Sequence, residues 1–148
     1  MRSAFLTVDK PPGITSHDVV AMLRRRFGER QVGHAGTLDP DATGVLLVGV
    51  GYVTRLMTYL SGMSKSYVGE VVVGSTTTTL DDSGETTATF DMSAVTLADV
   101  EAAAPRFVGE IEQIPPMVSA LKVDGKRLHE LAREGIEVER KARRITIQ

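Results

Sequence analysis

The segment GHAGTLDPDATG, from Gly33 to Gly44, limits the possible folds of this chain more than any other stretch. Its twelve residues include three glycines, one proline, one histidine and two aspartates, and the apolar run Val45–Val50 follows directly. Glycine permits positive φ, whereas proline fixes φ and lacks a backbone N–H, so this composition suits neither a helix interior nor a central strand. We therefore expect a rigid polar loop that leads into a buried strand.

The residues before this loop predict a strand followed by a helix. Phe5–Asp9 has the pattern of a short strand, and the breakers at 11–13 end it. Thr15–Asp18 has the spacing of a capping box, and apolar residues then recur at helical intervals. Because Gly28 suits a C-terminal cap, we expect a helix over Ser16–Phe27.

The residues after the loop alternate between helical and extended patterns. We expect short helices at Tyr52–Leu60, from Leu97 to about Phe107 and at Arg127–Arg133, and strands at Ser66–Val73, Thr76–Thr79, Thr86–Phe90 and Arg144–Ile147. This mixture of hairpins and separated helices predicts an α+β fold with a mixed, mainly antiparallel sheet and flanking helices. The length of 148 residues fits one domain of ordinary size.

Composition narrows the cellular setting. The chain has no cysteine, so disulfides and thiolate metal sites are excluded. Its apolar runs are much shorter than the roughly 20 residues that cross a bilayer, and its start lacks the apolar core of a signal peptide. We expect a cytoplasmic protein without a membrane partner.

Charge is unevenly distributed along the chain. The net charge is −2, yet residues 80–112 hold eight acidic residues and one basic residue, which leaves the two flanking parts mildly basic. Local clusters of basic residues in those parts are either phosphate-binding faces or ordinary solvated surface, and composition does not separate the two.

The spacing and position of the candidate residues argue against a zinc site and against phosphotransfer. The histidines, His17, His34 and His129, are far apart and lack the spacing of a zinc site. Asp39-x-Asp41-x-Thr43 matches the D-x-D-x-T pattern of haloacid-dehalogenase-like phosphotransferases, but that pattern should follow a buried strand, and here the apolar strand comes afterwards. Asp39 then remains, either as an ionised nucleophile or as part of a simple Asp-Pro turn.

At these residues the sequence resembles a known family. GHAGTLDPDATGVL, beginning at Gly33, resembles the catalytic motif of TruB-type pseudouridine synthases, which modify the T-loop uridine of transfer RNA. VDKPPGITS at Val8–Ser16, the K-x-Y segment at Lys65–Tyr67 and the stretch Gly109–Arg144 are similar to further segments of the same family, in the same order.

The resemblance implies a role for each matching residue. Asp39 would be the catalytic nucleophile, Tyr67 would stack on the uracil and assist proton transfer at C5, and His34 would lie near the flipped nucleotide. Lys10 would support the loop, and Gly36 and Thr37 would contribute to substrate binding. The resemblance implies the pseudouridine synthase fold, transfer RNA as partner through its T-arm, and no cofactor or metal.

The resemblance also sets the expected extent of the chain. The chain stops within a strand-like segment at Gln148. We therefore expect residues 1–148 to be the N-terminal portion of the catalytic domain, without the remainder of that domain and without a C-terminal RNA-binding domain. An arginine that should pair with Asp39 belongs to the missing part, and we expect this portion alone to be a weakly active or inactive monomer. A non-catalytic RNA-binding or chaperone-like module is the alternative from another functional class.

Overall fold

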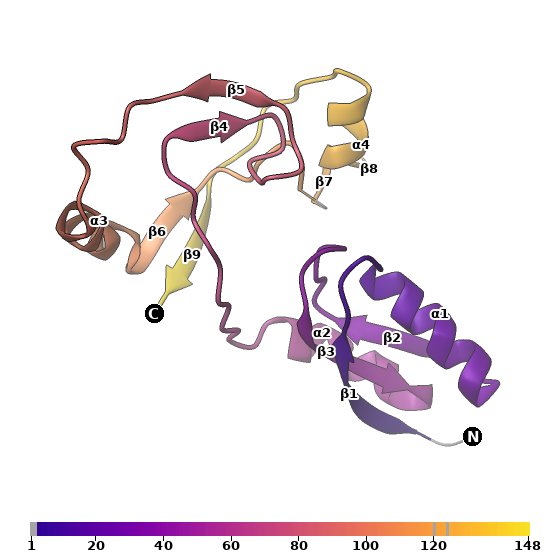
Figure 1. Ribbon diagram of the computed structural model, residues 1–148. Helices are drawn as coiled ribbons and strands as arrows, with labels where there is room; N and C mark the ends of the chain where they lie inside the picture. Colours follow the sequence, from indigo (N-terminus) through magenta and orange to yellow (C-terminus); the bar gives the residue numbers. More distant parts are fainter. Residues whose placement is uncertain (1–2, 120, 124) are drawn as a thin grey trace. The chain divides into compact units, whose positions relative to one another are not determined.

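The computed structural model describes residues 3–119, 121–123 and 125–148 (Figure 1). The chain divides into two compact units, Met1–Val68 and Gly69–Gln148. Every strand pair in the described part is antiparallel, and helices accompany the strands in both units. The expected α+β class with mainly antiparallel pairing is therefore confirmed.

The first unit is built on a three-stranded sheet of order β1–β3–β2. Strand β3 (Gly44–Val50) lies in the middle, paired along its whole length with β1 (Ala4–Lys10) and at its far end with β2 (Val32–Ala35). The predicted strands at Phe5–Asp9 and Val45–Val50 are both present. Val45 itself is 74% exposed, so the run that the sequence presents as uniformly apolar alternates between two faces at its start.

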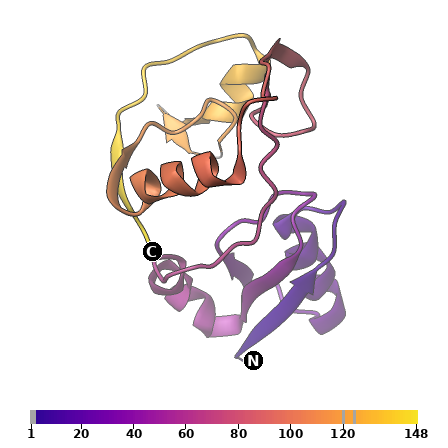
Figure 2. The same cartoon turned by 60° about the vertical axis from the view of Figure 1, so that its left-hand side comes forward.

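Helices cover both faces of this sheet. Helix α1 (Ser16–Phe27) lies against the sheet (Figures 1 and 2). Its Val19 and Val20 share a buried cluster with Leu46, Val48 and Val50. The opposite face receives the 3-10 helix η1 (Gly51–Leu56) and α2 (Met57–Ser61), which follow β3 directly. A Cβ added at Gly49 would lie 2.9 Å from the Met57 side chain, so the small residue lets α2 pack closely on the sheet.

The ends of α1 follow the sequence prediction. The Thr15 hydroxyl accepts from the Asp18 amide at 3.0 Å, and the Asp18 carboxylate accepts from the Thr15 amide at 2.8 Å. Gly28 caps the other end in the left-handed conformation, with φ at 60°. The bounds of this helix agree with those predicted because its signals are local.

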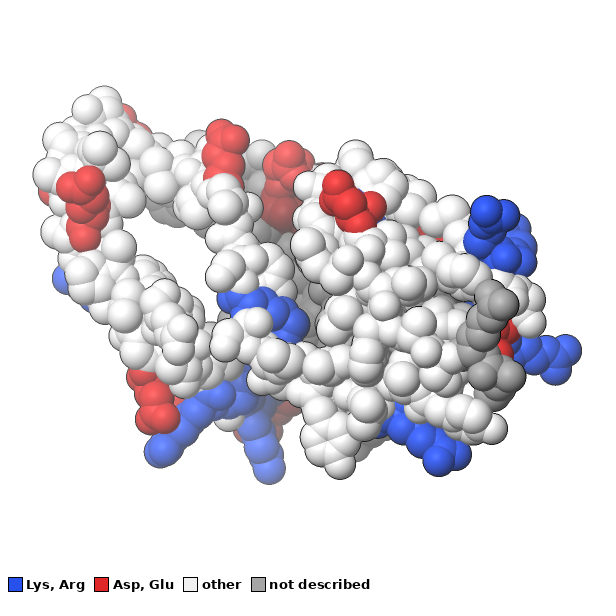
Figure 3. Space-filling model, turned by 90° about the horizontal axis from the view of Figure 1, so that it is seen from below, with Lys and Arg blue, Asp and Glu red and all other residues white. Residues whose placement is uncertain are grey.

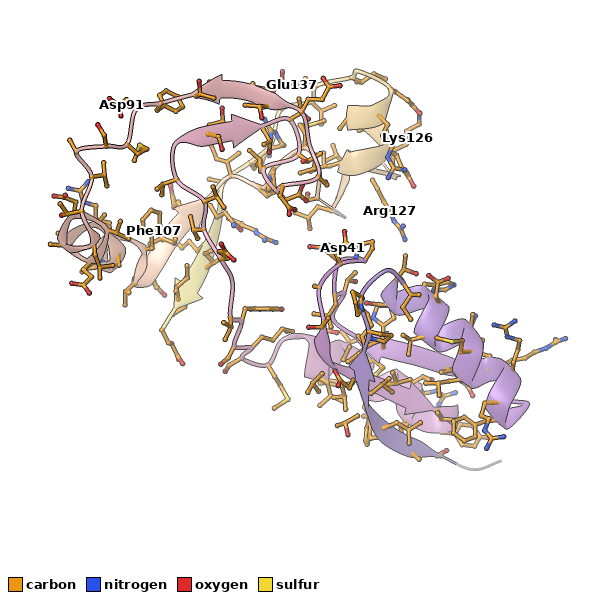
Figure 4. The ribbon with its side chains drawn as sticks, in the orientation of Figure 1. Asp41, Asp91, Phe107, Lys126, Arg127 and Glu137 are labelled. Atoms are coloured by element: carbon orange, nitrogen blue, oxygen red, sulfur yellow. The ribbon has the colours of Figure 1, made fainter. Side chains whose placement is uncertain are left out.

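In its described residues, the second unit contains three two-stranded sheets and two short α-helices. The predicted hairpin forms between β4 (Ser75–Thr77) and β5 (Thr86–Thr89), and helix α3 (Leu97–Ala103) continues into the 3-10 helix η2 (Ala104–Phe107). Strand β6 (Gly109–Gln113) pairs with β9 (Arg143–Ile147), and β7 (Lys122–Val123) with β8 (Lys126–Arg127), before α4 (Leu128–Arg133). In Figure 4, the Lys126 and Arg127 side chains project beside α4.

Two expectations differ from the structure. Ser66–Val73 forms no strand, and Val68, Val71 and Val72 are at least 70% exposed, because a β-branched sequence needs a neighbouring strand to satisfy its backbone. The segment from Gly33 is not all loop, since Val32–Ala35 pairs with β3. Among the described helices, none has the length and apolar character required to cross a membrane.

Candidate active site

The loop between β2 and β3, residues 36–43, is called the Asp39 loop below. Its first half is fixed to the start of α1 by Ser16, which is 1% exposed. The Ser16 hydroxyl donates to the Leu38 carbonyl at 3.1 Å and accepts from the Leu38 amide at 2.9 Å. One buried side chain thus satisfies both backbone groups of the residue before Asp39.

The residue after Asp39, Pro40, is held in place by a hydrogen bond from Lys10. The Lys10 side chain is fully buried, and its Nζ donates to the carbonyls of Pro11 at 2.9 Å, Ile14 at 2.7 Å and Pro40 at 2.8 Å. The Pro40 carbonyl also accepts from the Gly13 amide at 2.9 Å. All three donors of the ammonium are in use, so Lys10 ties the turn after β1 to the Asp39 loop.

Asp39 is exposed between these two anchors. Its carbonyl accepts from the Ala42 amide at 3.2 Å, which closes a turn. Within the described part of the chain its carboxylate makes no hydrogen bond or ion pair. The backbone of Asp39 is thus fixed in position, and its carboxylate is open to an incoming molecule. Asp41, two residues on, is also exposed and projects from the loop tip (Figure 4).

His34 and Gly36 lie at the entrance of the loop. His34 is on β2 rather than in the loop, and its ring Nδ1–H donates to the Gly36 carbonyl. In the neutral ring this arrangement leaves Nε2 as an acceptor. Gly36 has φ at 89°, and a Cβ there would lie 3.2 Å from Cε of Lys65. The glycine therefore permits both the turn and the close approach of the lysine stem.

The other expected site residues are less constrained. Thr37 is exposed at the start of the loop. Tyr67 belongs to no helix or strand and is 71% exposed, so its contact with a substrate base remains a prediction. Sequence reasoning did not assign roles to Ser16 and Lys65, although each lies in a motif that carried the resemblance.

These features define a unit that presents two exposed carboxylates, those of Asp39 and Asp41, from a loop with a fixed backbone, and such a loop suits an enzyme with an aspartate nucleophile. The chain belongs to the TruB family of pseudouridylate synthases, since the model of that family's N-terminal domain matches residues 24–148. It is 56% identical over 142 residues to "tRNA pseudouridine synthase B" of Symbiobacterium thermophilum and 52% identical over 147 residues to the protein of the same name from Moorella thermoacetica.

These matches cover nearly all of this chain but only about half of each relative. The two relatives cover 96% and 99% of this chain, but the chain covers 48% of each relative, so it spans about half their length. A chain in the crystal structure of a Cbf5-Nop10-Gar1 complex is similar over 80% of this chain and 30% of its own length, with a TM-score of 0.52 and 28% identity. The expected pseudouridine synthase fold is supported by this likeness for the part present here.

Proposed function

We propose that this chain carries the catalytic nucleophile of an isomerase that converts a T-loop uridine of transfer RNA to pseudouridine. The observation that carries the proposal is the Asp39 carboxylate, which is exposed on a loop fixed on one side by Ser16 and on the other by Lys10. The relatives named tRNA pseudouridine synthase B support the choice of substrate. We propose that the protein acts in the cytoplasm as a monomer, without metal or cofactor.

The reaction rearranges one nucleotide without adding or removing atoms. The bond between the ribose carbon and N1 of uracil breaks, a bond from the same carbon to C5 forms, the proton on C5 leaves, and N1 gains a proton. Asp39 serves as the nucleophile that keeps sugar and base associated while the base turns. The target base must first leave its stack, as in other enzymes that act on a base within folded nucleic acid.

The neighbours of Asp39 take supporting roles in this proposal. His34, with Nε2 free to accept a hydrogen bond, lies on the strand that leads into the loop and would assist the flipped nucleotide. Tyr67 would stack on the extruded uracil, as aromatic side chains do with unstacked RNA bases. Gly36 and Thr37 would approach the RNA backbone, and Lys10 would act through the loop because its ammonium is buried and fully used.

Asp39→Asn in the full-length protein tests the role of the carboxylate. The amide keeps the shape but is a poor nucleophile, so we expect conversion of T-loop uridine to fall by more than about a thousandfold while RNA binding is retained. Asp41→Asn is the matched control, because it removes the same charge from the same loop and should leave the rate within a fewfold of wild type.

The same pair of variants separates the competing functions. Equal conversion by the Asp39→Asn variant and wild type would refute the nucleophile. RNA binding by wild-type protein without any conversion would favour a non-catalytic RNA-binding module. Magnesium-dependent phosphate release that Asp39→Asn abolishes would favour a phosphotransferase.

A further inference from the structure

A cluster of arginines gathers where α1 ends. Arg24, Arg25 and Arg26 occupy the last turn of the helix, and Arg30 follows the Gly28 cap. Three of these arginines line an open hollow of about 490 Å³, called the α1 hollow below, whose lining residues are Arg24, Arg25, Gly28, Glu29 and Arg30. Figure 3 shows Lys and Arg side chains, in blue, that protrude from the surface in separate groups. Arg26 has the same charge but does not line the hollow.

The positive charge of the α1 hollow is only partly compensated within the described part of the chain. None of its three arginines makes an ion pair there, and Glu29 is its single acidic residue. The Glu29 carboxylate accepts from the Gln31 amide at 2.9 Å. Unpaired guanidinium groups around a hollow favour an anion, and their planar forks match phosphate oxygens in particular.

Part of the hollow is already ordered. Arg24 Nη2 donates to the Val32 carbonyl at 3.0 Å, which ties the end of α1 to the start of β2 and fixes this guanidinium. Gly28 contributes no side chain, and a Cβ there would meet no atom within 4 Å. The side chains of Arg25 and Arg30 make no hydrogen bond within the described residues and are exposed. Their donors are available to a ligand from solvent.

Basic residues in the last turn of a helix also have an ordinary explanation, because they offset the partial negative charge of its C-terminus. That effect is confined to the terminal turn. It accounts for Arg24–Arg26 but not for Arg30, which lies beyond the Gly28 cap and faces the same hollow.

The α1 hollow and the Asp39 loop belong to one compact unit. Ser16, at the first turn of α1, is bonded to Leu38 beside Asp39, and the helix is 12 residues long. At a rise of about 1.5 Å per residue, its two ends are roughly 18 Å apart. Asp39 and Asp41 repel phosphates at one end, so a polyanion bound there is favoured by positive charge away from that end, which the α1 hollow supplies.

We propose that the α1 hollow binds a backbone phosphate of the RNA substrate and so positions the strand that carries the reacting nucleotide. The proposal rests on the proposed function, since it takes RNA as the substrate. A phosphate contact of this kind fixes the register of the RNA without reading its sequence. It adds equally to the binding of substrate and transition state, so its loss should raise KM and leave kcat unchanged.

The test compares Arg25→Gln/Arg30→Gln with a charge-matched control in the full-length protein. Arg26→Gln/Arg106→Gln removes two positive charges from exposed positions outside the hollow. For the hollow variant we expect T-arm RNA to bind roughly tenfold more weakly at moderate salt. The slope of log K against log salt should become shallower by about 1, whereas the control changes either value little.

One further variant and one further assay keep the outcomes separate. Arg25→Lys/Arg30→Lys should restore most of the salt slope, because lysine keeps the charge, and failure to do so would refute an electrostatic phosphate contact. Equal binding and equal slopes for the hollow variant and the control would overturn the proposal. If wild type binds T-arm RNA but converts none of it, the proposed isomerase activity fails while the binding comparison still decides the role of the hollow.

Discussion

Lys10 links two turns that are distant in sequence, and its environment explains why the Asp39 loop has one defined shape. The side chain is fully buried, and its bond to Pro40 spans 30 residues of chain. A buried ammonium is costly unless its donors are satisfied, and three carbonyls satisfy them here. The motif match implied support of the loop, but the partners of Lys10 were not predictable because they depend on how β1 and β3 pair.

Replacement of Lys10 by Met should therefore destabilise the full-length protein and disorder the Asp39 loop. Three partly buried carbonyls would lose a charged donor, and we expect a loss of about 3 kcal/mol in the free energy of unfolding, measured by urea denaturation. Lys65→Met is the control, because Lys65 Nζ also donates to carbonyls, of Ser61 and Met63, but is exposed. Water replaces the lost donor there, so a cost similar to that of Lys10→Met would contradict this account.

His34 and Asp39 show where sequence reasoning succeeds and fails at the level of single residues. The exposed position of Asp39 is predictable from the sequence, because polar residues, glycines and a proline surround it. The placement of His34 on a strand was not, because Val32–Ala35 becomes a strand only by pairing with β3. A short, glycine-containing strand carries too little local signal to be distinguished from a loop.

At the scale of elements, locally specified structure agrees best with prediction. Both capping boxes form, at Thr15–Asp18 and at Thr96–Asp99, and the two helices start where these signals place them. Ser66–Val73 is the opposite case, because its strand propensity has no partner strand in this structure. Propensity and capping act within a few residues, whereas a strand needs a neighbour that the local sequence does not specify.

The capping box of α1 predicts a pH dependence of stability. The Thr15 hydroxyl donates to the Asp18 carboxylate, and the Thr15 amide does so as well; these bonds hold the pKa of Asp18 below the ordinary value of an aspartate carboxyl. The resulting stabilisation is present above the unfolded pKa and is lost as the pH falls through the lower folded pKa.

We therefore expect the stability of the Asp18→Asn variant to decline less than that of wild type as the pH falls below about 4. Thermal unfolding measured at several acidic pH values tests this expectation. Asp82→Asn is the control, since the exposed Asp82 carboxylate makes no hydrogen bond in the described part of the chain. An unchanged pH profile for Asp18→Asn would show that the capping box contributes nothing to acid sensitivity.

At the scale of the whole molecule, family membership and length have to be considered together. Residues 24–148 match the N-terminal domain of the TruB family, and the chain spans about half the length of the relatives it matches. The first unit holds Lys10, His34 and the Asp39 loop, all supported by contacts within that unit. The proposed nucleophile, Asp39, is thus held by contacts within the first 68 residues, while the activity proposed for it belongs to the full-length protein.

The most direct test of that activity is a nucleoside analysis of T-loop RNA after incubation with the full-length protein and no added cofactor. Pseudouridine has the same mass as uridine, so the digested nucleosides are separated by chromatography before they are quantified. We predict that one uridine per RNA is converted by the wild-type protein and by the Asp41→Asn variant, and none by the Asp39→Asn variant. RNA that binds the wild-type protein but keeps all of its uridine unchanged would contradict the proposed isomerase.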